Sequence, residues 1–176
     1  MKSPQDVYRR FIDFEEQAAS IYLRMASRFS PENLDVGSVW LDMGIHEKQH
    51  AGLLQFCVAE ELFATDLPSE REILETEGLF SRLTRQAANP DLSVEEAFEI
   101  AAQLETSEVN AIYDRLTTPL HASTYLLRRK IAASLPDHLE HLLNEARRLK
   151  ISPESLERLE QLFSRGRERQ QRAGPA

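Results

Sequence analysis

The chain has 176 residues, of which 41% are hydrophobic and 28% are charged, and it is long enough for one domain with a substantial core. Its eight prolines mostly accompany helix-capping residues, which favours helices over strands. The net charge of −8 argues against a nucleic-acid partner, because nucleic-acid binding depends on cationic contacts to phosphate. The single cysteine, Cys57, excludes a disulfide framework and a four-cysteine iron or zinc site.

The first predicted helix covers about residues 4–29 and begins at Ser3-Pro4, where serine can cap the free amides and proline suits the first helical position. No apolar leader precedes it, and no part of the chain has the roughly 20 apolar residues of a membrane span, so we expect a cytoplasmic protein without membrane contact. Glu15 falls within the helix's apolar stripe, where a lone carboxylate is costly. Glu15 is therefore a candidate ligand. The stripe consists of Val7, Phe11, Phe14, Ala18, Ile21 and Met25.

The second predicted helix runs over about 31–63 and begins at Ser30-Pro31, with Ser30 as the expected cap. Its short link to the first helix forces an antiparallel hairpin. It contains a Glu-x-x-His, Glu47 to His50, whose three-residue step sets carboxylate and imidazole on one face, about 5–6 Å apart at Cβ. Pro31 lies midway between Glu15 and Glu47, at the hairpin turn. Antiparallel helices would therefore bring these two carboxylates level and form one metal half-site.

Four further helices are predicted, over about 70–86, 94–117, 120–149 and 153–168. Helices 70–86 and 94–117 begin with capping boxes, Ser69-x-x-Glu72 and Ser93-x-x-Glu96. Pro136 should interrupt or kink helix 120–149. We therefore expect an all-α chain: an antiparallel four-helix bundle over 4–149, with helix 70–86 as a crossover, and a C-terminal amphipathic helix with a polar tail over 150–176.

The second half of the chain repeats the layout of the first. Glu105 lies on the predicted third helix of the bundle and His141 on the fourth, almost as far apart along the chain as Glu15 and His50, with a turn near their midpoint. Two hairpins that each place a glutamate opposite a histidine give the ligand pattern of ferritin-like dimetal bundles.

Three motifs over about residues 5–148 resemble the rubrerythrin branch of the ferritin-like superfamily. They are Glu15-Glu16-Gln17-Ala18-Ala19-Ser20-Ile21-Tyr22, Glu47-x-x-His50, and Glu105-Thr106-Ser107-Glu108 followed by Tyr113. The resemblance implies a pair of iron ions bridged by Glu47 and Glu105, with Glu15 and Glu108 as terminal ligands. Tyr22 and Tyr113 would then lie beside the ligands, where each could hydrogen-bond a ligand or pack in the core.

The predicted fourth helix departs from that family. A Glu-x-x-His is expected there, but the chain has His138-Leu139-Glu140-His141. Because imidazole also binds iron, we expect His138 and His141 to supply nitrogen ligands together with His50. Alternatively, Pro136 shifts the register so that Asp137 and His141 form the pair. We expect His46 to lie at the surface or beside a ligand rather than to bind metal, and His121 to be a capping or solvated residue. Cys57 and Trp40 should pack in the core.

Carboxylates with a few histidines suit Fe²⁺, and Mn²⁺ is a further option. Two irons could exchange two electrons with dioxygen or hydrogen peroxide, which predicts a ferroxidase- or peroxidase-like oxidoreductase. Cys57 alone cannot build a rubredoxin iron site, so electrons would come from a separate donor, and the resemblance also implies a homodimer. The alternative is a non-enzymatic helical bundle with a degenerate or single-metal site that acts in metal binding or protein interaction.

Overall fold

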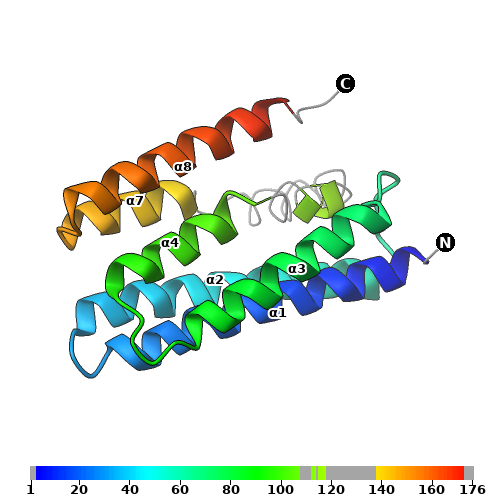
Figure 1. The fold of residues 1–176 in the computed structure, drawn as a ribbon. Helices are drawn as coiled ribbons and strands as arrows, with labels where there is room; N and C mark the ends of the chain where they lie inside the picture. Colours follow the sequence, from blue (N-terminus) through cyan, green and yellow to red (C-terminus); the bar gives the residue numbers. More distant parts are fainter. Residues whose placement is uncertain (1–2, 108–111, 114, 118–137, 173–176) are drawn as a thin grey trace, which may run out of the picture.

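The structure is a computed structural model that describes residues 3–107, 112–113, 115–117 and 138–172, with the backbone alone at 138–139 and 165–172. All regular secondary structure in these ranges is helical, which confirms the prediction of an all-α chain (Figure 1). The helices are α1 (Pro4–Phe29), α2 (Leu34–Ala59), α3 (Glu70–Ala87), α4 (Val94–Glu105), α7 (His138–Arg148) and α8 (Pro153–Arg172).

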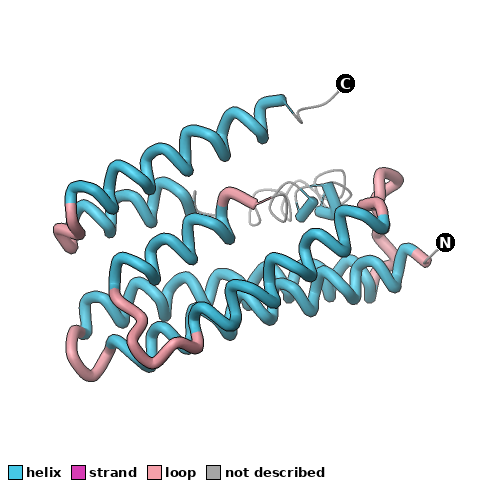
Figure 2. Tube along the Cα trace, in the orientation of Figure 1, coloured by secondary structure: helices cyan, strands magenta, loops and turns pink. Residues whose placement is uncertain are grey.

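Helices α1 and α2 form the predicted antiparallel hairpin (Figures 1 and 2). The turn differs from the prediction, because Ser30 ends α1 instead of capping α2: its hydroxyl donates to the Ala26 carbonyl at 2.6 Å. Asn33 caps α2 in its place, since its side-chain oxygen accepts the amides of Asp35 and Val36 at 3.0 and 3.3 Å. Helix α2 therefore begins at Leu34 rather than at residue 31.

Close contact between the hairpin helices depends on glycine. A Cβ atom at Gly37 would lie 2.8 Å from Ser30 Cα, and one at Gly44 would lie 3.0 Å from the side chain of Leu23 on α1. Both glycines of α2 therefore allow the chain of α1 to come close, one at the turn and the other further along the hairpin, where a larger residue would push the helices apart.

Helix α3 lies beside α1, as a crossover element should (Figure 1). The rings of Phe14 and Phe80 stack with centroids 5.2 Å apart, and Arg10 Nε donates to Glu77 Oε1 at 2.9 Å. The capping boxes predicted at Ser69 and Ser93 are both present, so α3 and α4 begin where the sequence indicated.

Helix α4 is shorter than predicted. It ends at Glu105, and helical backbone is described again only at 112–113 and 115–117. The hydroxyls of Thr106 and Ser107 donate to the carbonyls of Ala102 and Leu104, each at 2.6 Å. Such side-chain bonds to backbone carbonyls compete with helix continuation, which explains the break in the expected helix 94–117.

Helices α7 and α8 form a second hairpin that packs against α4 (Figure 1). Leu142 and Ala146 of α7 and Leu159 and Phe163 of α8 belong to the same buried cluster as the side chains of α1 and α2. The ion pair between Arg148 and Asp35, at 3.6 Å, brings the end of α7 to the start of α2. No helix in the described ranges is long and apolar enough to cross a membrane.

The remainder of the predicted fourth bundle helix, including Pro136 and the turn at Thr118-Pro119, lies outside the described residues.

Candidate metal centre

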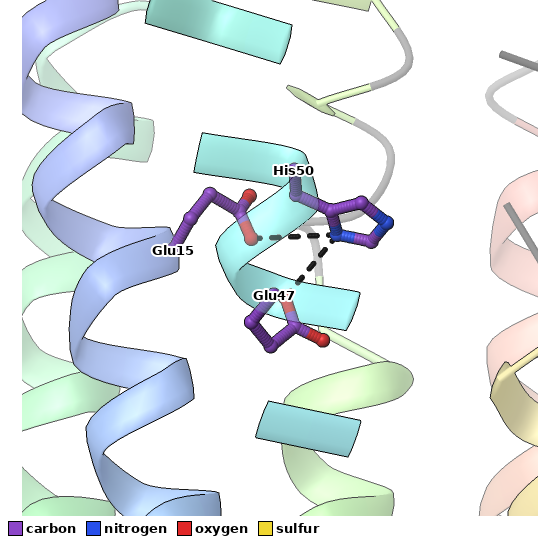
Figure 3. A group of neighbouring side chains, drawn as sticks. All are labelled: Glu15, Glu47 and His50. Carbon is purple, nitrogen blue, oxygen red and sulfur yellow. Dashed lines mark hydrogen bonds and ion pairs between the residues drawn. The ribbon is translucent and has the colours of Figure 1, made fainter. Parts of the chain in front are cut away.

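Three ligating side chains meet between α1 and α2. Glu15 comes from α1, and Glu47 and His50 come from α2 (Figure 3). His50 Nδ1 lies 3.2 Å from Glu47 Oε2 and 3.6 Å from Glu15 Oε2. One ligand atom from each residue lies within 4.8 Å of the others, so the group could hold a metal ion. The hairpin thus brings together the three residues predicted as one half-site.

The local structure explains this placement. Glu47 and His50 are three residues apart on one helix, so their side chains share a face. Glu15 lies on the buried face of α1, level with them across the hairpin (Figure 3). Only 2%, 4% and 6% of Glu15, Glu47 and His50 remain exposed.

A third carboxylate, Glu105, approaches the group from α4. It is also buried, and Tyr22 of α1 donates its O–H to Glu105 Oε1 at 2.7 Å. Glu105 is the last residue of α4, where the negative end of the helix dipole disfavours a carboxylate unless positive charge lies nearby. Its charge acts on both Glu47 and Tyr22.

Burial and mutual repulsion shift the acid–base behaviour of the centre. Burial raises the pKa of Glu47 against the effect of its hydrogen bond from His50, and the charges of Glu105 and Glu15 raise it further. Burial alone would lower the pKa of His50, but its bonds to Glu15 and Glu47 raise that pKa overall. Burial and the charge of Glu105 hold the pKa of Tyr22 well above its usual range, so this phenol stays protonated.

The donor set fits a cation. Glu15 Oε1 is buried and has no hydrogen-bond partner among the described residues. A buried acceptor without a donor is costly, and buried carboxylates normally bind a cation or a strong donor. His50 Nδ1 lies within 3.6 Å of a carboxylate oxygen of both glutamates, so a metal ion bound by these side chains would take the place of the proton or protons that the metal-free group shares.

Aromatic rings fix the surroundings. The Tyr113 ring packs on the imidazole of His50 with centroids 4.5 Å apart, and Tyr113 is buried. Trp40 is parallel to Tyr22 at 6.3 Å and packs on Phe98 at 4.7 Å, as expected for a core residue. These rings restrict the motion of His50 and of the tyrosine that holds Glu105.

The remaining predicted ligands are described only in part. Glu108, Asp137 and the side chain of His138 lie outside the described residues, as does His121. His141 is half-buried on α7; its Nε2 is buried with no hydrogen-bond partner among the described residues, and it is not part of the Glu15, Glu47 and His50 group.

Two residues that we expected outside the metal centre are also described. Cys57 is buried, as predicted, and His46 is half-buried.

Comparison with protein-family models, with curated proteins and with solved structures gives no match for the chain. The resemblance to rubrerythrins therefore rests on the motifs of the sequence, and the argument for function rests on the geometry of the centre.

Proposed function

We propose that the chain is a non-haem di-iron protein of ferritin-like type, an oxidoreductase that reacts with dioxygen or hydrogen peroxide. The observation that carries the proposal is the buried Glu15, Glu47 and His50 group, whose ligand atoms lie within 4.8 Å of one another. A buried carboxylate with an unpartnered oxygen is costly in an apolar core unless a cation binds it.

Each described residue has a distinct part in this proposal. Glu15, Glu47 and His50 would hold one ion, and Glu47 and Glu105 are the described carboxylates that would help to hold a second. Tyr22 donates to Glu105 at 2.7 Å and so orients its carboxylate, while the packing of Tyr113 on His50 fixes the imidazole plane. Glu108, His138 and His141 are the further ligands that the sequence offers for the second ion.

The chemistry of the donors favours iron, with manganese as the nearest alternative, because carboxylates and imidazole suit these metals and no thiolate joins the described group. When bound, a pair of irons would supply two electrons to a small oxidant. Glu15, Glu47 and Glu105 would offset three of the four positive charges of two Fe²⁺ ions, and Glu108 is the further carboxylate that the sequence offers. The electrons would return from a separate donor, since Cys57 is buried and is the only cysteine.

The experiment loads the purified chain anaerobically with Fe²⁺, removes loose metal and then admits oxygen or peroxide. We expect two irons per chain and consumption of the oxidant in proportion to bound iron. Glu47→Ala should lose both, whereas Glu16→Ala, which removes the neighbouring half-exposed carboxylate on α1, should keep both. Bound iron that never oxidises would contradict the enzymatic part of the proposal.

A second function deserves the same test, because the described residues gather three ligands rather than a full dimetal set. A single-metal protein without oxidase activity would bind one ion per chain through Glu15, Glu47 and His50. One ion per chain, together with no effect of a Tyr22→Phe substitution on binding, would favour this alternative over the di-iron protein.

A further inference from the structure

The imidazole of His50 has one edge toward the carboxylates and one edge away from them. Its Nδ1 lies 3.2 Å from Glu47 Oε2 and 3.6 Å from Glu15 Oε2, and Figure 3 shows the other ring nitrogen directed away from both glutamates. On the α4 side, Glu105 is bonded to Tyr22. Within the described part of the chain, the far side of the imidazole is therefore where another molecule could approach the centre.

The ring of Tyr113 covers that far side. The centroids of the Tyr113 and His50 rings are 4.5 Å apart and their planes differ by 32°, so the two rings are in van der Waals contact and leave no room for another group between them. Tyr113 is 3% exposed, and His50 beneath it is 6% exposed. The Tyr113 ring thus forms a wall of the centre.

This wall belongs to a part of the chain beyond α4, which ends at Glu105. We call the helical backbone described at 112–113 and 115–117 the Tyr113 segment. Its apolar side chains, Ile112 and Leu116, are 1% and 0% exposed. Thr117 Oγ1 donates to the Tyr113 carbonyl at 3.0 Å, which closes one helical turn around the ring's own residue. The core therefore holds the Tyr113 segment by side chains of its own.

A buried tyrosine of α1 fixes the position of the Tyr113 segment. Tyr8 is 0% exposed, and its O–H donates to the Leu116 carbonyl at 2.6 Å. The same oxygen accepts the amide of Ala64, in the connection between α2 and α3, at 2.9 Å. Buried hydrogen bonds of this kind are costly to break, because each partner would be left unsatisfied in the core. Tyr8 therefore ties the segment to α1 and to the α2–α3 connection.

An ion pair adds a second anchor, on α3. Arg115 donates to Glu72 Oε1 at 2.6 Å. The other oxygen of Glu72 accepts the amide and the hydroxyl of Ser69, at 2.7 and 2.6 Å, so this carboxylate is itself held in place at the start of α3. Anchors on two different helices make the Tyr113 ring a fixed wall rather than a side chain that swings aside.

We propose that Tyr113 determines which molecules reach the metal centre, because its ring closes the space beside His50 to anything larger than dioxygen or hydrogen peroxide. The inference rests on the proposed function for the nature of these small oxidants. Either kind of peroxide takes up two electrons from ferrous iron and two protons. Hydrogen peroxide leaves as two water molecules, and an alkyl hydroperoxide leaves as an alcohol and one water molecule. Size rather than chemistry therefore separates the two.

Binding of p-cresol, which is the side chain of tyrosine without its backbone, tests the wall in the metal-free protein. Tyr113→Ala leaves a cavity beside His50, and apolar cavities made by such truncations bind small aromatic molecules. NMR of the His50 ring protons detects the binding, because a ring stacked on the imidazole shifts their resonances. We expect p-cresol to restore the wild-type resonances in Tyr113→Ala and to leave those of the wild type and of Tyr113→Phe unchanged.

Phe80→Ala is the matched control. Phe80 is a buried ring of α3 that stacks on Phe14 of α1, so its loss opens a cavity between these two helices. Addition of p-cresol to this variant should leave the His50 resonances unchanged. Circular dichroism checks that each variant is folded. Tyr113→Leu, which keeps part of the packing, replaces Tyr113→Ala in the peroxide experiment below if the alanine variant does not fold.

Oxidation of the anaerobically iron-loaded protein by hydrogen peroxide and by tert-butyl hydroperoxide tests the size limit. We expect the wild type to react about 100-fold faster with hydrogen peroxide, and Tyr113→Ala to lower this ratio of rates to about tenfold or less. Tyr113→Phe and Phe80→Ala should keep the wild-type ratio, and p-cresol should restore it in Tyr113→Ala. Because both rates come from one preparation, a change in iron content does not alter their ratio.

Two results would overturn the proposal. One is p-cresol that moves the His50 resonances of the wild type, since the space would then be open with Tyr113 in place. The other is a ratio of rates that Tyr113→Ala leaves at the wild-type value. A wild type that reduces neither peroxide would end the proposed function instead, and the p-cresol experiment, which needs no metal, would then decide by itself whether Tyr113 closes the space beside His50.

Discussion

At the scale of single residues, the candidate centre places carboxylates where a core normally places apolar side chains. The sequence could predict Glu15, Glu47 and His50 as a group, because helical spacing and a hairpin turn determine which residues become level. It left open whether Tyr22 hydrogen-bonds a ligand or only packs in the core, and the structure shows the bond to Glu105, which depends on how α4 packs against α1. Residue types and spacing therefore identify the ligands within one hairpin, but they do not identify the contacts between hairpins equally well.

The first residue-scale prediction compares two neighbouring glutamates. Glu15→Gln removes a buried ligand and should weaken metal binding at least 100-fold, since even the loss of a residue that only supports a ligand costs about 10–100-fold. Glu16→Gln removes only a half-exposed ion pair with Lys48, worth less than about 1 kcal/mol, and should bind metal as the wild type does. Isothermal titration of the anaerobic proteins with Fe²⁺ measures both. Equal affinities in the two variants would exclude Glu15 as a ligand.

The second residue-scale prediction concerns pH. In the metal-free fold the pKa values of Glu47 and His50 are raised above their ordinary values of 4.5 and 6.5, so the folded chain holds protons that the unfolded chain releases. This contribution to stability is complete below those ordinary values and is lost as the pH rises through the folded ones. The free energy of unfolding should therefore fall from about pH 4.5 upward, by up to about 1.4 kcal/mol per pH unit for each titrating proton: one from Glu47 between pH 4.5 and about 8, and one from His50 between pH 6.5 and about 10.

Urea titrations of the metal-free protein between pH 6 and pH 9 measure this slope. His50→Gln removes one of the two titrating groups and should flatten it. Because metal must displace the same protons, affinity for Fe²⁺ should rise over this range. A free energy of unfolding that increases with pH in the metal-free wild type would contradict the claim that the folded chain holds more protons than the unfolded chain.

At the scale of elements, caps and periodicity predicted where most helices begin, and local hydrogen bonds from side chains to backbone carbonyls accompany the ends of α1 and α4. The boxes at Ser69 and Ser93 cap α3 and α4 as expected. The end of α4 at Glu105 was not predicted, because the spacing of apolar residues does not reveal the hydrogen bonds of Thr106 and Ser107 to backbone carbonyls. The turn between α1 and α2 was expected at Pro31, but the choice of Asn33 over Ser30 as the cap of α2 depends on local geometry.

The element-scale prediction concerns the hairpin. Gly37→Ala introduces a Cβ atom 2.8 Å from Ser30 Cα, so the turn must shift, at a cost of about 1–3 kcal/mol in unfolding free energy. Gly78→Ala on α3 meets nothing within 4 Å and should stabilise the chain by up to about 1 kcal/mol through helix propensity. Thermal unfolding compares them. Because the turn brings Glu15 level with Glu47, Gly37→Ala should also weaken metal binding. Unchanged metal affinity would show that the turn does not determine the geometry of the centre.

At the scale of the whole molecule, α1, α2, α3, α4, α7 and α8 all contribute to one buried cluster, and the candidate metal centre lies where α1, α2 and α4 meet. The sequence predicted an all-helical chain because its apolar stripes have helical period and its turns carry capping residues. It predicted an amphipathic C-terminal helix, and Leu159 and Phe163 of α8 are buried in the common core. Amphipathic helices reveal a buried face but not the partner that covers it.

The whole-molecule prediction links metal to stability. A ligand that binds only the folded state at a free concentration 100 times its dissociation constant adds about 2.7 kcal/mol, which for a chain of this size raises the unfolding temperature by about 5–10 °C. Calorimetry with and without Fe²⁺ under anaerobic conditions measures the shift. Glu15→Gln should show almost none at the same metal concentration. A shift of equal size in that variant would place the stabilising metal elsewhere.

Anomalous scattering at the iron edge, from an anaerobic crystal soaked in Fe²⁺, would show whether Glu15, Glu47 and His50 hold iron inside the helical core. We expect one iron within coordination distance of all three side chains and a second beside Glu47 and Glu105. Iron found only at surface carboxylates, with the three side chains still bonded to one another as in Figure 3, would contradict this expectation.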